Sequence, residues 1–218
     1  MNIALIGATG FVGSPILAEL LSRGHQVTVL ARDPAKLSTQ VAAQAGMTVV
    51  KANALVAEQV ARAVAGHDAV ISAYNPGWGE AKLYDLAIAG NQSIIDGVKQ
   101  AGVKRFLSIG GAGSLYVAPG VQLVDTPNFP AEYYQAALAM REVLNRIQQE
   151  NSLDWSVLTP PIALAAGERT GKYRLWHDDL LKGSAEAPAG ISAADLAMAL
   201  IDELETPRHL QRRFTVAH

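Results

Sequence analysis

Gly7-Ala8-Thr9-Gly10-Phe11-Val12-Gly13 is the stretch that decides the fold class, because it places three glycines in a G-x-x-G-x-x-G spacing. It follows a short apolar run at residues 2–6 and opens a stretch in which Val12, Ile16 and Leu20 fall four residues apart, as on one face of a helix. Glycines let the backbone turn sharply, and the unpaired N–H groups at a helix start attract an anion. A strand, such a turn and a helix together predict a dinucleotide-binding βαβ unit whose turn holds the pyrophosphate.

The same alternation continues along the chain. Short apolar runs alternate with amphipathic helical stretches as far as about Pro161, a pattern that predicts βαβ units and a parallel sheet. Gly24, Gly66 and Gly102 each stand where a left-handed residue would end a helix. We therefore predict an α/β fold of the Rossmann type, with a doubly wound, mainly parallel sheet. The expected strands lie at residues 2–6, 26–31, 48–51, 69–73, 105–109 and 155–158.

The pattern changes after residues 160–161. A glycine-containing stretch leads to a helix expected from near Ser192, which fits an N-cap, and then to a short strand at residues 213–216. We predict one domain over residues 1–218, in which residues 162–191 form a small, irregular C-terminal lobe that covers the substrate. Arg212 and Arg213 are expected to face solvent at the start of the last strand.

Composition excludes several classes of protein. The 218 residues carry a formal net charge of only −2, and no stretch concentrates Lys or Arg, so we expect no nucleic-acid partner. The absence of cysteine excludes disulfides and thiolate metal sites, and the five histidines lack ligand spacing, so no metal is expected. The N-terminal apolar run is too short to span a bilayer and lacks the features of a signal peptide, which favours no membrane and a cytoplasmic location.

Arg32 follows the second strand at the position that distinguishes the two nicotinamide dinucleotides. A protein that prefers NAD places an acid there, on the ribose 2′-hydroxyl. A guanidinium can instead pair bidentately with a 2′-phosphate, so NADP(H) is preferred and NAD(H) is the second choice. Asp33 could bind the ribose and reverse this preference. However, Asp33-Pro34 also fits a helix N-cap followed by proline, and we favour that interpretation.

The chain resembles the atypical short-chain dehydrogenase/reductases, in particular the NmrA-like, biliverdin-reductase-B-like group of NAD(P)H-flavin reductases. The resemblance covers nearly the whole chain. It is carried by residues 7–13, Ala31-Arg32-Asp33-Pro34, Gly110-Gly111-Ala112-Gly113-Ser114-Leu115, Pro127-x-Phe129-Pro130-Ala131-Glu132-Tyr133 and Gly167-Glu168-Arg169-Thr170-Gly171-Lys172-Tyr173-Arg174.

The resemblance also implies which residues contact the cofactor, in addition to the turn and Arg32. Asn53, followed by Ala54, stands where the family has an Asp that meets the adenine amino group, and its amide oxygen can still accept that bond. The residues implied to line the adenosine ribose, largely through their backbone, are Ser72, Ala73 and Tyr74. The residues implied to flank the nicotinamide are Gly110, Gly111, Thr159, Pro160 and Pro161.

The catalytic half departs from the conventional family pattern. Conventional members use a Ser with a Tyr-x-x-x-Lys pair, but here Tyr133 and Tyr134 are followed four residues later by Ala137 and Leu138. A flavin or quinone delocalises the incoming charge and can take its proton from solvent, so the protein need only stack the ring against the nicotinamide. We therefore expect an NADPH-dependent flavin or quinone reductase that uses direct hydride transfer.

The expected acceptor is a small planar molecule, with FMN, FAD or riboflavin as substrate or ligand. Gly110 and Gly111 are expected to leave a floor for the flat ring. The candidates for ring contact are Tyr133, Ser114 and Trp78, which could equally be a helix anchor, a turn former and an exposed loop aromatic. The alternative function is a redox-sensing module that binds NADP(H) without chemistry, and a homodimer stays open as the assembly.

Overall fold

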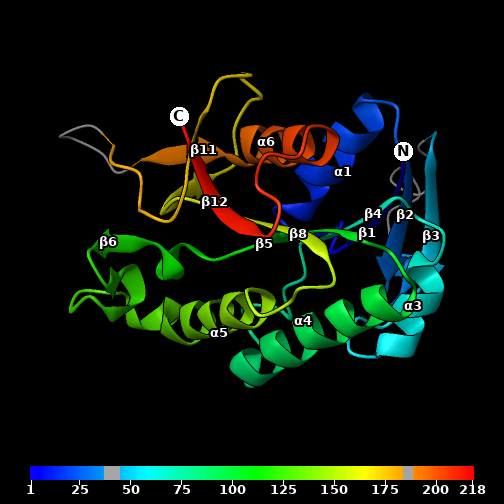
Figure 1. The fold of residues 1–218 in the computed structure, drawn as a ribbon, viewed down its shortest axis with the longest axis horizontal. Coiled ribbons are helices and arrows are strands. Elements are labelled where there is room, and N and C mark those ends of the chain that lie inside the picture. Colours follow the sequence, from blue (N-terminus) through cyan, green and yellow to red (C-terminus); the bar gives the residue numbers. More distant parts are fainter. Residues whose placement is uncertain (37–44, 184–188) are drawn as a thin grey trace.

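The computed structural model describes residues 1–36, 45–183 and 189–218, which build a sheet with helices on both faces (Figure 1). The eight strands of the sheet lie in the order β10-β12-β8-β5-β4-β1-β2-β3, and only β10 is antiparallel to its neighbour. The chain winds outward from β1 in one direction and from β4 in the other, so the winding reverses between these two strands. The parallel strands are β1 (Asn2–Ile6), β2 (Gln26–Ala31), β3 (Met47–Lys51), β4 (Ala69–Ser72), β5 (Arg105–Ile109), β8 (Asp154–Thr159) and β12 (Arg212–Ala217).

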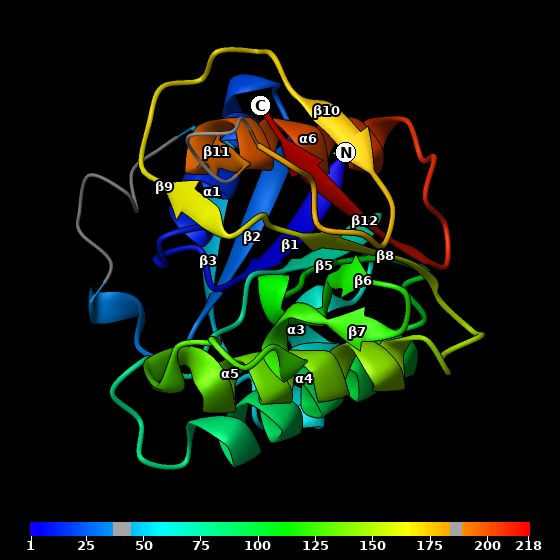
Figure 2. The ribbon, with the colours of Figure 1, turned by 90° about the vertical axis from the view of Figure 1, so that its left-hand side faces the viewer.

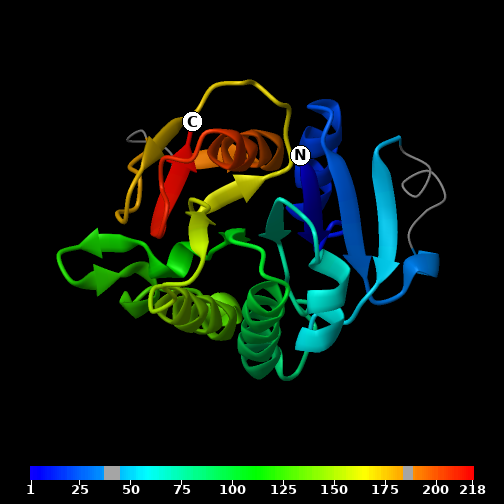
Figure 3. The ribbon, with the colours of Figure 1, turned by 45° about the vertical axis from the view of Figure 1, so that its right-hand side comes forward.

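The helices form two layers, one on each face of the sheet (Figure 3). Ile16, Leu17 and Leu20 of α1 pack with α6 on one face, as their four-residue spacing predicts. α3, α4 and α5 bury the opposite face. Among the described residues, no helix combines the length and the apolar character that a bilayer crossing requires. The helices are α1 (Gly13–Ser22), α3 (Ala57–Val64), α4 (Leu83–Gln100), α5 (Ala131–Ile147) and α6 (Ala193–Glu205).

These elements confirm the predicted fold class, and every expected strand is found within one residue at each end. Gly24, Gly66 and Gly102 have φ angles of +78°, +76° and +74°, so each takes the left-handed conformation expected after a helix. Ser192 caps α6, because its hydroxyl accepts a hydrogen bond from the N–H of Asp195.

The C-terminal lobe is more regular than the sequence suggested. It contains β9 (Ala163–Ala165) and β11 (Gly190–Ser192), which pair in parallel, and β10 (Arg174–Trp176), which adds to the main sheet beside β12. Backbone pairing with existing strands orders these short segments, which have no pattern of their own. Residues 184–188 of the lobe lie outside the described residues. Figure 2 shows the segment between β9 and β10 arching over α6, on the sheet face opposite α5.

The expectation that Arg213 faces solvent is wrong. Arg213 is only 5 % exposed, because the segment after β5 covers its face of β12. Its guanidinium donates to the carbonyl oxygen of Ser114 at 2.6 Å and to the carboxylate of Asp178 at 2.8 Å, and it lies over the ring of Tyr116. Arg213 thus ties the last strand to the loop after β5. That segment also forms a hairpin, and its elements are η2 (Ala112–Ser114), β6 (Tyr116–Ala118), β7 (Val121–Gln122) and η3 (Leu123–Asp125).

Candidate functional site

The turn between β1 and α1 has a shape that only glycine allows at two of its positions. Gly7 has φ +84°, and a Cβ there would lie 2.4 Å from the carbonyl oxygen of Ala73. A Cβ on Gly13 would lie 1.9 Å from the carbonyl oxygen of Gly7. The N–H of Gly10 donates to that same oxygen at 3.0 Å, which closes the turn. The glycines are therefore needed for close backbone packing of the turn against β4 and α1.

The start of α1 is open to an anion. Within the described part of the chain, the N–H groups of Phe11, Val12 and Gly13 donate to no acceptor. No side chain caps the helix, and its first turn has no acidic residue. These free N–H groups and the positive end of the helix dipole suit a pyrophosphate, so the turn fits the dinucleotide that the sequence predicted. Thr9, Gly10 and Phe11 are exposed, whereas Ala8 and Gly13 are buried beneath them.

Arg32 lies at the same edge of the sheet as this turn. It directly follows β2 and is exposed. Burial raises the pKa of Tyr74, and the positive charge of Arg32 opposes that rise. The carboxylate of Asp33 accepts a hydrogen bond from the N–H of Ala35 at 3.2 Å. It caps the short 3₁₀ helix η1 (Pro34–Lys36), which confirms the capping interpretation.

The residues expected around the adenosine follow β3 and β4. The amide oxygen of Asn53 accepts a hydrogen bond from the N–H of Leu55 at 3.1 Å, in a turn that leads to α3. This oxygen has a second lone pair that could accept a bond from the adenine amino group, so adenine recognition by Asn53 stays a prediction. Ala54 and Ser72 are buried. The Tyr74 hydroxyl donates to the carbonyl oxygen of Leu86, and its ring packs on Gly90, where a Cβ would lie 2.2 Å away. These contacts engage the Tyr74 side chain with α4, and lining of the ribose by the backbone of Ala73 and Tyr74 stays a prediction.

Gly110 and Gly111 are required for close packing inside the protein, and their role as a floor for a flat ring stays a prediction. A Cβ on Gly110 would lie 2.6 Å from the hydroxyl oxygen of Thr159, and one on Gly111 would lie 2.9 Å from the Cβ of Met140. The missing side chains therefore make room for β8 and α5. Thr159 is fully buried, and its hydroxyl has no hydrogen-bond partner among the described residues. Pro160 and Pro161 are buried directly after it.

The three candidates for contact with the acceptor ring have different environments in the structure. Ser114 is 1 % exposed, and its hydroxyl donates to the carbonyl oxygen of Gly111 at 2.9 Å, so it forms a turn rather than an acceptor contact. Trp78, in the loop after β4, meets Tyr133, in the first turn of α5. Their ring centroids are 5.8 Å apart, and the rings are inclined at 81°. Two residues 55 positions apart in the sequence thus form one exposed aromatic pair.

Exposed apolar side chains gather at the carboxyl ends of the parallel strands. Each lies in a segment that follows a strand or in the first turn of the next helix. Ligands of open α/β sheets bind at this edge, so an apolar rim here suits a flat organic molecule. The rim residues are Phe11, Leu55, Trp78, Tyr133, Tyr134 and Ile162.

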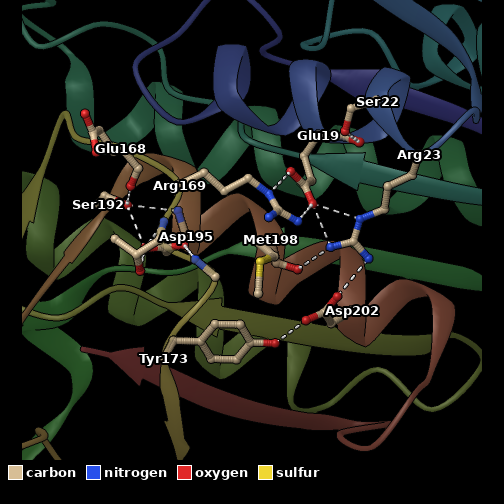
Figure 4. A network of polar contacts seen from close by, with 12 residues as sticks. Glu19, Ser22, Arg23, Glu168, Arg169, Tyr173, Ser192, Asp195, Met198 and Asp202 are labelled. Atoms are coloured by element: carbon tan, nitrogen blue, oxygen red, sulfur yellow. Dashed lines mark hydrogen bonds and ion pairs between the residues drawn. The ribbon is translucent and has the colours of Figure 1, made fainter.

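The segment Gly167–Arg174 holds helices α1 and α6 together, and the covering of a substrate by the lobe stays a prediction. Arg169 donates to Glu19 of α1 at 2.8 and 2.9 Å (Figure 4). The Thr170 hydroxyl donates to Asp195 of α6 at 2.6 Å, and the Tyr173 hydroxyl donates to Asp202. We did not predict this strap of residues 167–174. A detectable signal was Glu19, a carboxylate within the apolar stripe of α1.

Comparison with known proteins places the chain in a family. A family profile described as NAD(P)H-binding matches residues 7–207. The uncharacterized protein YwnB of Bacillus subtilis is 37 % identical over 99 % of this chain and 98 % of its own length. A candidate epimerase of Bacteroides thetaiotaomicron is 43 % identical, with a TM-score of 0.90, over 100 % of this chain and 96 % of that one. A candidate NADH-flavin reductase of Streptococcus pneumoniae is 32 % identical, with a TM-score of 0.83, over 100 % and 99 %.

Proposed function

Because the chain belongs to the NAD(P)H-binding family, as its resemblance to atypical short-chain dehydrogenase/reductases led us to expect, we propose that it is an NADPH-dependent reductase of flavins or quinones. The family and the reductase-like neighbour support the general activity, an NAD(P)H-dependent oxidoreduction. The observation that carries the narrower proposal is an aromatic, apolar rim at the cofactor edge without a Tyr-x-x-x-Lys pair.

Bound NADPH supplies a hydride, and the acceptor takes that hydride together with one proton from solvent, which yields NADP⁺ and the reduced acceptor. The residues of the chain bind and orient the two reactants. When the dinucleotide binds, the N–H groups of Phe11, Val12 and Gly13 would hold its pyrophosphate, and Arg32 would pair with its 2′-phosphate. The rim excludes water from the acceptor, and proximity alone can lower the barrier by about 7–11 kcal/mol at best.

Two other functions receive less support. The neighbour described as a candidate epimerase suggests an epimerase reaction, but this chain has Ala137 and Leu138 where a lysine would assist Tyr133 or Tyr134. A non-catalytic NADP(H) sensor also fits the missing lysine. It does not account for an exposed Trp78–Tyr133 pair at the edge where an acceptor would meet the nicotinamide.

The direct test is turnover. Purified protein is mixed with NADPH and FMN, riboflavin or a quinone under anaerobic conditions, and the nicotinamide absorbance is followed. We expect oxidation well above the rate without protein. If NADPH raises the melting temperature, as a ligand of the native state must, yet none of these acceptors is reduced, the reductase proposal is wrong and the sensor is preferred.

Arg32→Ala tests the preference for NADPH. Losing a charge-assisted contact to the 2′-phosphate should raise the Kd of NADPH by about 10–100-fold, since such bonds contribute about 1.5–3 kcal/mol. The Kd of NADH should change by less than about 2-fold, because NADH lacks that phosphate. Isothermal titration measures both.

Arg62→Ala is the matched control, because Arg62 is an exposed arginine in the last turn of α3, on the segment that leads away from this edge. Equal losses for the two dinucleotides in Arg32→Ala, or the same loss in Arg62→Ala, would contradict a specific role of Arg32.

A further inference from the structure

Trp78 lies exposed in the loop after β4, at the edge of the sheet where the cofactor is expected to bind, and the bonds that close this loop are local. The indole is 65 % exposed and stands between Gly77 and Gly79. Gly77 has φ +120°, and no atom lies within 4 Å of a Cβ added to Gly79. The loop is closed by local bonds, in which the N–H of Gly77 donates to the Asn75 side chain at 2.8 Å and the N–H of Glu80 donates to the carbonyl oxygen of Gly77 at 3.2 Å. The indole therefore has room to turn about the two glycines.

The segments that carry Trp78 and Tyr133 pack against the predicted dinucleotide site and the strand ends beside it. The loop of Trp78 begins at Ala73, whose carbonyl oxygen packs against Gly7 of the phosphate turn. Tyr133 lies one helical turn before Ala137, and the Cβ of Ala137 lies 2.7 Å from where a Cβ of Gly113 would be. The pair thus bridges the segments that follow β4 and β5, which flank the space expected for the nicotinamide.

We propose that Trp78 and Tyr133 form a clamp that selects a fused, flat isoalloxazine ring over a single-ring quinone. This inference rests on the proposed function. At an angle of 81° the two rings meet edge to face, so neither ring is stacked and each can offer a face to a third ring. Trp78 turns out of this contact and lies face-on over the acceptor, while Tyr133 stays on α5 and contacts its edge. A tricyclic ring covers more of the indole than a single ring does, so it gains more from the clamp.

Charge favours recognition of the ring rather than of a phosphate tail. Glu80 and Glu132 are exposed near Trp78 and Tyr133 in the sequence, and Lys82 is the nearest following cation. Acidic and basic residues both occur close to the pair in the sequence, so we take the uncharged ring, which riboflavin and FMN share, as the feature that the clamp would bind. The two flavins therefore form separate arms of the experiment.

The binding test uses tryptophan fluorescence. Trp176→Phe removes the other exposed indole and leaves Trp78 together with the buried Trp155. The double variant Trp78→Phe/Trp176→Phe keeps Trp155 alone, so the difference in quenching between the two proteins reports Trp78. Riboflavin or FMN is titrated with NADP⁺ present, which binds without supplying a hydride. We expect quenching by both flavins with similar Kd values. Trp78→Ala, read by quenching of flavin emission, should raise both Kd values about 10-fold, and Trp78→Phe should restore most of the affinity. Trp176→Ala, a tryptophan 51 % exposed on β10, is the control and should change neither.

Steady-state kinetics separate this inference from the proposed function. The ratio of kcat/KM for riboflavin to that for benzoquinone should fall about 10-fold in Trp78→Ala, mainly through KM for riboflavin. Unchanged flavin affinity and an unchanged ratio would overturn the clamp while leaving the reductase proposal intact. A wild-type protein that binds riboflavin through Trp78 but reduces no acceptor would overturn the reductase proposal, while the ring-binding clamp stands.

Discussion

Gly7→Ala is expected to weaken NADPH binding by at least about 100-fold, the largest single effect that we predict on the cofactor. The new Cβ would lie 2.4 Å from the carbonyl oxygen of Ala73, which is backbone at the end of β4 and cannot rotate away. The turn must therefore move, and its free N–H groups move with it. Isothermal titration with NADPH and a thermal melt of the same sample measure binding and folding separately.

Gly66→Ala is the control for this experiment. Gly66 has φ +76°, close to the +84° of Gly7, but nothing lies within 4 Å of an added Cβ. Both variants thus carry the cost of a left-handed alanine, about 1–2 kcal/mol. Only Gly7→Ala adds the steric clash in the turn. If Gly7→Ala is folded and binds NADPH as Gly66→Ala does, the turn is not the pyrophosphate site, and the reductase and sensor functions both lose their basis.

Asp195→Asn should reduce the free energy of unfolding by about 2–4 kcal/mol, the largest effect that we predict on stability. Asp195 is fully buried and accepts hydrogen bonds from the Thr170 hydroxyl, the Gly171 N–H and the His218 ring. An amide cannot accept all of these bonds, and it has no charge for His218. Urea unfolding followed by circular dichroism measures the loss.

Asp85→Asn is the matched control, since Asp85 also lies in the first turn of a helix but is exposed. It tests the helix dipole alone, which contributes about 0.3–1 kcal/mol. Equal losses in the two variants would contradict the role of the strap contacts.

The same carboxylate should make stability depend on acid. Burial by itself would raise the pKa of Asp195, but the bonds from Thr170, Gly171 and His218 outweigh it and lower the pKa to about 2. A carboxylate with a lowered pKa stabilises the fold fully above its unfolded pKa of 3.8 and loses that effect as the pH falls toward 2. The stability difference between the wild type and Asp195→Asn should therefore be constant above about pH 4 and shrink below it. A difference that does not change with pH would rule out this linkage.

Sequence patterns were sufficient to predict the strands of the sheet and the tight turn between β1 and α1. The spacing of Ile16 and Leu20, and glycines such as Gly24 at helix ends, act over a few residues, so their structural effect can be predicted without the rest of the chain. The cap formed by Asp33 belongs to the same class. The three glycines of residues 7–13 predicted the tight turn for the same reason, and pyrophosphate binding at that turn stays a prediction.

Tertiary structure alone decided which distant residues meet. Arg213 was predicted to face solvent because a sequence does not say that the loop after β5 folds over β12. Gly110 makes room for Thr159, and this contact depends on the pairing of β5 with β8. The strap from Arg169 to Glu19 and the Trp78–Tyr133 pair join segments far apart in the chain. Local propensity specifies helices, strands and turns, whereas these contacts exist only after the sheet has set the positions of its connecting segments.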